Sequence, residues 1–276
     1  MSTPQRVNKA HPCPVCAKDS WCMTGTDIIF CMRVASPRQK TFADGSTAYL
    51  HARNGTPLPR PVYLKPQESP INCRLILEKW DLLYGTRSLE YLSKTLGVTR
   101  ESLDMLGCVK SPQHSVWAFP MRDGLNYIIG IRLRHENGRK WCEPGSHNGL
   151  FIPQRINPQS ELVITEGPTD CAAAISIGLY AVGRFNCSGG VYMINEFIKE
   201  RRIGRVMIVA DVDNDREING VTVNPGIQEA MALSELLEVP SCTVTLPTKD
   251  MREFVSRGGT REAFNSIVSG LVWRNP

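Results

Sequence analysis

From residue 161 onward, apolar runs alternate with helical patterns, and this alternation constrains the fold more than any other feature. The runs ELVITEG, LYAVGRF, GRVMIVADVD and SCTVTLP are separated by PTDCAAAISIG, VYMINEFIKERRI and NPGIQEAMALSELLEV, and DMREFVSRGG begins a helical tail. Strands that alternate with helices form a parallel sheet with helical crossovers. The sequence therefore predicts an α/β unit over residues 159–276, with helices flanking a parallel sheet.

Two of the predicted strands end in carboxylates. Glu166 follows the run LVIT, and Asp211, Asp213 and Asp215 follow VMIVA. Parallel strands end at a common edge, so these side chains converge there if the strands lie close together. Converging carboxylates repel one another unless cations intervene, and hard oxygen ligands suit Mg²⁺ or Mn²⁺. Either motif alone is weak, because an E-G-x-x-D or a D-x-D sequence occurs often by chance.

Near the N-terminus, CPVCAKDSWCMTGTDIIFC has the spacing C-x2-C-x5-C-x8-C. Zinc requires four ligands in a tetrahedron, and a block of about 40 residues needs a metal because it cannot build a sufficient core. The predicted ligands are Cys13, Cys16, Cys22 and Cys31. His11 could replace Cys22, but we favour four cysteines because Trp21 and Phe30 flank two of them as in small-domain packing. The alternative is a set of free or disulfide-bonded cysteines.

Charge and composition indicate the compartment and the class of partner. The net charge is +5, with nine Lys/Arg and four Asp/Glu in residues 1–70, which leaves 23 of each in the remainder (32 − 9 and 27 − 4). The basic excess suggests an anionic partner at the N-terminal end. No run of 18 apolar residues and no apolar signal region is present, so we expect a cytoplasmic protein without membrane contact.

The chain divides into four segments. Residues 1–52 contain the cysteine block, and residues 53–70 contain five prolines and are predicted to form a linker. Residues 71–158 begin with helical patterns, one of them with Thr99 as N-cap, and continue with strands. Asp123-Gly124 and Asn137-Gly138 are predicted hairpin turns. Residues 159–276 form the α/β unit.

EGPTD followed about 40 residues later by DVDND resembles the Toprim domain. The order of zinc knuckle, linker and this motif pair resembles DnaG-like and phage-type DNA primases in particular. The resemblance extends from Cys13 to about Gly259. It implies a zinc ribbon-like module, a middle region of helices and β-hairpins, and a Toprim-type sheet. It also implies an enzyme that makes short primers on a single-stranded DNA template from nucleoside triphosphates by divalent-metal-dependent nucleotidyl transfer.

The resemblance also implies roles for individual residues. Glu166, Asp211 and Asp213 would be catalytic and hold Mg²⁺ or Mn²⁺, while Asp170 and Asp215 would be secondary. The segment GIRLRHENGRKWCEPGSHNGLF resembles the part of phage primases that precedes the Toprim core. Its candidates for binding nucleotide and template are Arg132, Arg134 and Lys140, although alternation alone would make the two arginines solvent-facing. PTKDMREFV makes Asp250 either a further acid of the site or a helix N-cap.

Two other functions use the same residues. A Toprim nuclease would use the carboxylates to direct water, and a non-catalytic zinc protein would bind single-stranded DNA and recruit others. No G-x-x-x-x-G-K-[ST] sequence occurs in the chain, so we expect a separate replicative helicase. A bacterial cell, a phage or a mobile element is the expected source.

Overall fold

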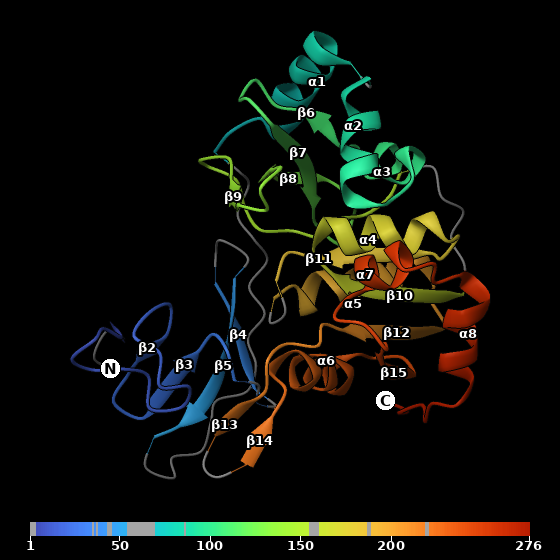
Figure 1. The fold of residues 1–276 in the computed structure, drawn as a ribbon. Helices are drawn as coiled ribbons and strands as arrows, with labels where there is room; N and C mark the ends of the chain where they lie inside the picture. The colour runs from blue at the N-terminus through green and yellow to red at the C-terminus, as the bar shows by residue number, and fades with distance from the viewer. Residues whose placement is uncertain are drawn as a thin grey trace.

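Figure 1 shows the fold of the protein in a computed structural model. The structure describes residues 4–34, 36, 38–42, 46–53, 70–85, 87–154, 160–186, 189–218 and 221–276. Apart from its two end residues, the predicted linker 53–70 lies outside the described residues. We refer to the described residues of 4–53 as the cysteine module, those of 70–154 as the middle unit, and those of 160–276 as the parallel-sheet unit.

The cysteine module is built on an antiparallel sheet with the order β1-β2-β3-β5-β4. Its strands are β1 Gln5–Arg6, β2 Met23–Thr24, β3 Ile28–Cys31, β4 Gln39–Thr41 and β5 Thr47–Ala52. The β2–β3 hairpin between the last two cysteines carries Cys31 back toward the other three. The apolar cores are small: one contains Phe30, Ala48 and Leu50, and another surrounds the cysteines.

The middle unit places three helices on a second antiparallel sheet, in agreement with the sequence. Its elements are α1 Cys73–Tyr84, α2 Arg87–Leu96, α3 Arg100–Met105, β6 Val109–Lys110, β7 Val116–Arg122, β8 Ile128–His135 and β9 Lys140–Cys142. Thr99 caps α3 by accepting a hydrogen bond from the Ser102 amide at 3.2 Å. Helix α1 covers one face of the sheet, while Trp117 and Phe119 on the other face join the main core.

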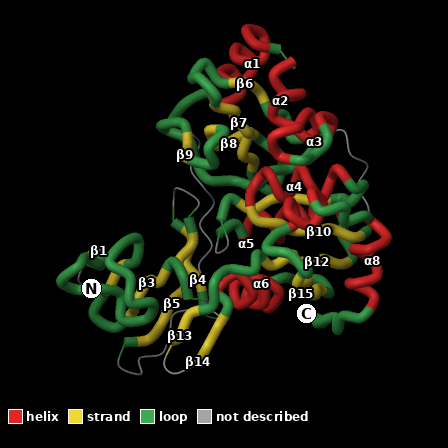
Figure 2. Tube along the Cα trace, viewed as in Figure 1, coloured by secondary structure: helices red, strands yellow, loops and turns green. Residues whose placement is uncertain are grey.

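The parallel-sheet unit has four parallel strands in the order β11-β10-β12-β15. Its elements are β10 Glu161–Glu166, α4 Gly167–Ser176, β11 Ala181–Arg184, α5 Val191–Arg201, β12 Arg205–Ala210, β13 Arg216–Ile218, β14 Val221–Val223, α6 Pro225–Leu236, β15 Ser241–Thr245, α7 Met251–Ser256 and α8 Arg261–Ser269. Each predicted strand and helix of this region is present. The β13–β14 hairpin, which projects from the sheet in Figures 1 and 2, was not predicted.

Helices cover both faces of this sheet, so its strands are buried. Helix α4 packs with α7, and α5 contacts α6 through the Asn195 side chain, which donates to the Leu236 carbonyl at 3.0 Å. Strand β10 lies between β11 and β12. The chain therefore continues from β10 to β11 on one side and then crosses back to β12 on the other side of β10. Ligands of open α/β sheets bind at such reversals, at the carboxyl ends of the strands. No helix among the described residues is long and apolar enough to cross a membrane.

Candidate active site at the carboxyl edge of the parallel sheet

Glu166 and Asp211 extend from neighbouring strands. Strands β10 and β12 pair in a register that places Ile164 beside Ile208, so the ends of the two strands lie side by side. Glu166 is the N-cap residue of α4, but its carboxylate makes no capping hydrogen bond. The chain turns away immediately through Gly167, whose φ of +79° favours glycine. The two residues therefore lie at adjacent strand ends on one edge of the sheet, close enough for the charge of Glu166 to raise the pKa of Asp211.

The loop after β12 is fixed by backbone contacts to two other segments. The Val212 amide donates to the Lys249 carbonyl at 2.6 Å, and the Asp213 amide donates to Asn224 Oδ1 at 3.2 Å. Asn224 also donates through Nδ2 to Asp215 Oδ1 at 3.0 Å. The Asp215 side chain thus helps to hold the loop, while Asp213 is exposed at the edge.

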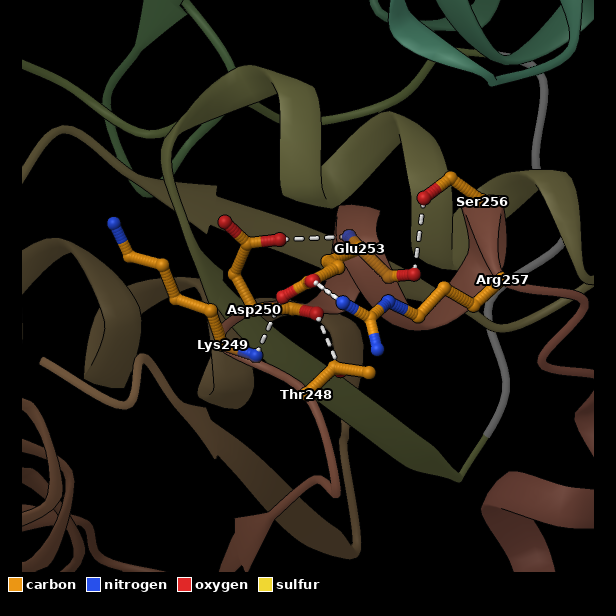
Figure 3. A network of polar contacts seen from close by, with 6 residues as sticks. All are labelled: Thr248, Lys249, Asp250, Glu253, Ser256 and Arg257. Atoms are coloured by element: carbon orange, nitrogen blue, oxygen red, sulfur yellow. Dashed lines mark hydrogen bonds and ion pairs between the residues drawn. The ribbon is translucent and has the colours of Figure 1, made fainter.

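Asp250 caps a helix and also belongs electrostatically to the acidic cluster. Its Oδ1 accepts from the Glu253 amide at 2.7 Å, and Glu253 Oε2 accepts in return from the Lys249 amide at 2.9 Å, as Figure 3 shows. Asp250 is therefore the N-cap residue of α7, and the Glu253 side chain adds a contact to the residue before the cap, so the N-cap interpretation of Asp250 is confirmed. Helix α7 also supplies the Arg252 amide, which donates to buried Asp170 Oδ1 at 3.0 Å.

Burial and the charges of neighbouring acids raise the pKa values of three carboxylates at this edge, Glu166, Asp170 and Asp211. Burial raises the pKa of Asp211 to about 8, with further contributions from the charges of Glu166, Asp170, Asp250 and Asp213. Burial likewise raises the pKa of Asp170 to about 6, with Asp250 the next cause. The pKa of Glu166 is also raised, chiefly by burial. A divalent cation would favour the ionised forms and reverse this effect.

The predicted basic residues lie on the face of the middle sheet that turns toward the acids. Lys140 is the cross-strand neighbour of Arg134, so both side chains share one face. Arg134 is only 8% exposed, and burial lowers its pKa while the charge of Asp170 opposes that shift. The solvent-facing alternative is therefore wrong for Arg134. Arg132 donates through Nη2 to the Phe185 carbonyl at 3.1 Å.

Lys140 is exposed, and its charge lowers the pKa values of Glu166 and Asp170 against the larger effect of burial. Sequence reasoning missed two further cations of the site, Arg184 and Lys249, both of which also act on Glu166. Arg184 ends β11 beside Glu166. Its place at the end of a predicted strand was the one signal that could have identified it.

The four cysteines form a second candidate metal site. Their sulfur atoms all lie within 4.8 Å of one another, and among the described residues this is the one group of three or more candidate ligands close enough to hold a single ion. Backbone amides of Met32 and Val34 donate to the sulfurs of Cys22 and Cys31 at 3.4 and 3.2 Å. Such donors suit thiolates.

Four thiolates are the donor set of a structural zinc ion, so the group fits one zinc. His11 is exposed and outside this group, so the structure favours Cys22 over His11. Phe30 is buried as expected, but Trp21 is 70% exposed and does not pack into the module.

Fold and sites together define an α/β protein with an N-terminal cysteine cluster, antiparallel sheets and a parallel four-stranded sheet flanked by helices. A DnaG primase catalytic domain bound to single-stranded DNA matches with a TM-score of 0.54 and 16% identity, over 72% of this chain and 78% of that chain. The zinc-binding and RNA polymerase domains of the Aquifex aeolicus primase match with a TM-score of 0.53 and 17% identity, over 72% of this chain and 61% of that chain. A DNA primase domain from Pseudomonas aeruginosa matches with a TM-score of 0.51 and 17% identity, over 73% of this chain and 79% of that chain.

At these identities the likeness concerns the fold, and the predicted resemblance to DnaG-like primases is confirmed at that level. No family model and no curated protein matches the sequence.

Proposed function

We propose that this protein is a DNA primase that joins nucleotides into short primers on a single-stranded DNA template. The observation that carries the proposal is the meeting of Glu166 and Asp211 at one sheet edge, opposite the cations Arg134 and Lys140. The primase-like fold and the cysteine cluster add support. A protein that only bound DNA would gain nothing from clustered carboxylates beside the phosphates it had to hold.

The acidic edge fits divalent ions that share their coordination with a substrate. Its ligands are hard oxygens, which suit Mg²⁺ or Mn²⁺. Among the described residues the acids do not form a group close enough to enclose an ion by themselves, so nucleotide phosphates and water would complete the coordination. Glu166, Asp211 and Asp213 would hold the ions. When bound, such ions lower the pKa of an attacking 3′-hydroxyl and neutralise the departing pyrophosphate.

The remaining residues would bind and orient the substrate. Exposed Lys140 and Lys249 can bind the triphosphate, since cations form strong charge-assisted hydrogen bonds with phosphate oxygens. Arg134 is held by its buried surroundings and can fix one phosphate in position. In the cysteine module, exposed Trp21 offers a face on which a template base can stack. A separate helicase would present the unwound strand.

The test is an incubation of the protein with single-stranded template, ribonucleoside triphosphates and Mg²⁺ or Mn²⁺. We expect new short oligonucleotides from the wild type and from Glu235→Gln, an exposed position of α6, and none from Glu166→Gln. Shortening of the template would instead identify a nuclease. A mobility shift without any product, unchanged in Glu166→Gln, would identify a DNA-binding protein.

A second variant tests the role of Lys140. Lys140→Ala should raise the KM for nucleotide about tenfold or more, because a charge-assisted hydrogen bond to phosphate is lost. Arg139→Ala is the matched control, since Arg139 is also exposed but lies over the Trp141 ring. Equal KM values for the two variants would contradict the assignment of Lys140.

A further inference from the structure

One face of the cysteine module buries polar side chains outside its own apolar clusters. Tyr49 is 1% exposed and Gln39, its cross-strand neighbour, is 0% exposed. Both project from the same face of β4 and β5, because directly opposed residues of an antiparallel pair share a face. Tyr49 belongs to none of the apolar clusters of the described residues, which in this module contain Phe30 and Leu50. The face is therefore covered by another part of the chain.

That covering part is helix α6 of the parallel-sheet unit. The Tyr49 hydroxyl donates to Glu229 Oε2, across 180 positions of sequence. A cavity of about 350 Å³ lies alongside, lined by Cys16 and Arg33 from the module and by Glu217 and Gln228 from β13 and α6. Figure 1 shows the module beside β13, β14 and α6.

Glu229 depends on the contact with Tyr49. It is 1% exposed, and its Oε1 has no hydrogen-bond partner among the described residues. Burial raises the pKa of Glu229 to about 7, while the Tyr49 hydrogen bond and the charge of Arg184 oppose this shift. A buried carboxyl group that loses a hydrogen-bond donor while it stays covered is destabilised, so the Tyr49 hydroxyl stabilises Glu229 in the docked arrangement.

The same contact lies between the two candidate metal sites. Tyr49 is the cross-strand neighbour of Cys31, one of the four cysteines. On the other side, Arg184 acts electrostatically on Glu229 and is the register partner of Glu166. Strand pairing and charge interactions thus relate the Tyr49–Glu229 contact to the cysteine cluster on one side and to the acidic edge on the other.

We propose that the hydrogen bond from Tyr49 to Glu229 docks the cysteine module onto the parallel-sheet unit of its own chain. The module therefore serves its own acidic edge rather than that of a second copy. This last point rests on the proposed primase function, whereas the docking itself does not.

Hydrogen exchange and solution scattering test the docking without any activity. We expect residues 47–52 and α6 to be protected in the wild type. In Tyr49→Phe and Glu229→Gln the amides of these segments should exchange about tenfold faster, as the loss of a hydrogen bond to an acidic group predicts. The radius of gyration of both variants should increase while the mass stays that of a monomer. Zinc content should stay at the wild-type level, which shows that the module remains folded. Tyr84→Phe and Glu235→Gln change exposed residues and should behave as the wild type.

Docking is refuted if both variants exchange and scatter like the wild type, or if the wild-type particle doubles its mass at the concentrations where the segments are protected. A wild type that makes no primers but releases its module in Tyr49→Phe would refute the primase proposal and leave the docking intact.

Complementation tests whether the module acts within its own chain. A Cys22→Ser variant, which lacks one sulfur, is mixed with a Glu166→Gln variant, which lacks an acid of the edge. Because the modules are docked, we expect the mixture to make no primers. Addition of Tyr49→Phe to the Glu166→Gln chain should release its module and restore synthesis to several times the background. Restoration without the Tyr49 change would refute action within one chain.

Discussion

Replacement of Asp211 by asparagine tests the electrostatics of the acidic edge in the folded protein. Burial and neighbouring carboxylates raise the pKa of Asp211 from 3.8 to about 8. The folded state therefore retains a proton that the unfolded chain releases at a lower pH. A raised acid pKa makes stability fall as the pH rises through the window between the unfolded and folded values, here from about pH 4 to about pH 8.

The size of the effect follows from the width of the window. Between about pH 6 and about pH 8, two pKa units at about 1.4 kcal/mol each give a loss of roughly 3 kcal/mol in the free energy of unfolding. In a chain of this size, such a loss lowers Tm by roughly 5 to 10 °C. Asp211→Asn removes the ionisable group, so this part of the pH dependence should disappear.

The assay is thermal unfolding of the zinc-loaded protein without other divalent ions, at both pH values. Wild type and Asp81→Asn, an exposed position of α1, should lose stability with rising pH, while Asp211→Asn loses much less. Added Mg²⁺ should raise the Tm of the wild type at the higher pH and have little effect on Asp211→Asn, because the ion binds the ionised carboxylates. Parallel Tm curves for wild type and Asp211→Asn would refute the reasoning.

Two further predictions concern the cysteine site and the packing beneath the acidic loop. Cys22→Ser should lower the zinc bound per chain and unfold the module. His11→Ala should leave the zinc content unchanged, because His11 lies outside the sulfur group. Equal zinc loss in the two variants would contradict the assignment of four cysteine ligands. Gly226→Ala should destabilise the protein by about 1–3 kcal/mol in chemical unfolding, since a Cβ there would lie 1.9 Å from the Asp211 carbonyl oxygen. Gly204→Ala is the control and should be close to neutral, because its Cβ would make an ordinary contact at 3.4 Å. Equal effects of the two substitutions would contradict this packing.

The fold was predictable where a local pattern determined it. Each strand of the parallel sheet is a continuous apolar run because both faces are buried, and each run was recognisable without knowledge of its neighbours. The same holds for Thr99 and Asp250, whose capping contacts involve residues three positions along the chain. The meeting of Glu166 and Asp211 was predictable because parallel strands end at one edge.

Contacts between distant segments had no such signal. Tyr49 and Glu229 meet across two units, and neither belongs to a recognisable motif. Arg134 follows the alternation of an exposed strand position, yet another unit covers it. Trp21 illustrates the opposite error, since an aromatic residue beside a cysteine need not be buried. The burial of a side chain depends on what packs over it, and local periodicity does not contain that information.

The two groups of candidate metal ligands differ in how much of the chain must emerge before each is complete. The four sulfurs lie within residues 13–31, whereas the acidic edge needs β10, β12 and the segment after β15, as far as Asp250. During synthesis on the ribosome, the thiolates can capture their ion long before the last strand of the sheet exists. A fragment truncated ahead of residue 241 would thus contain all four candidate zinc ligands but lack part of the acidic edge. Zinc content alone is therefore a misleading measure of the quality of a preparation.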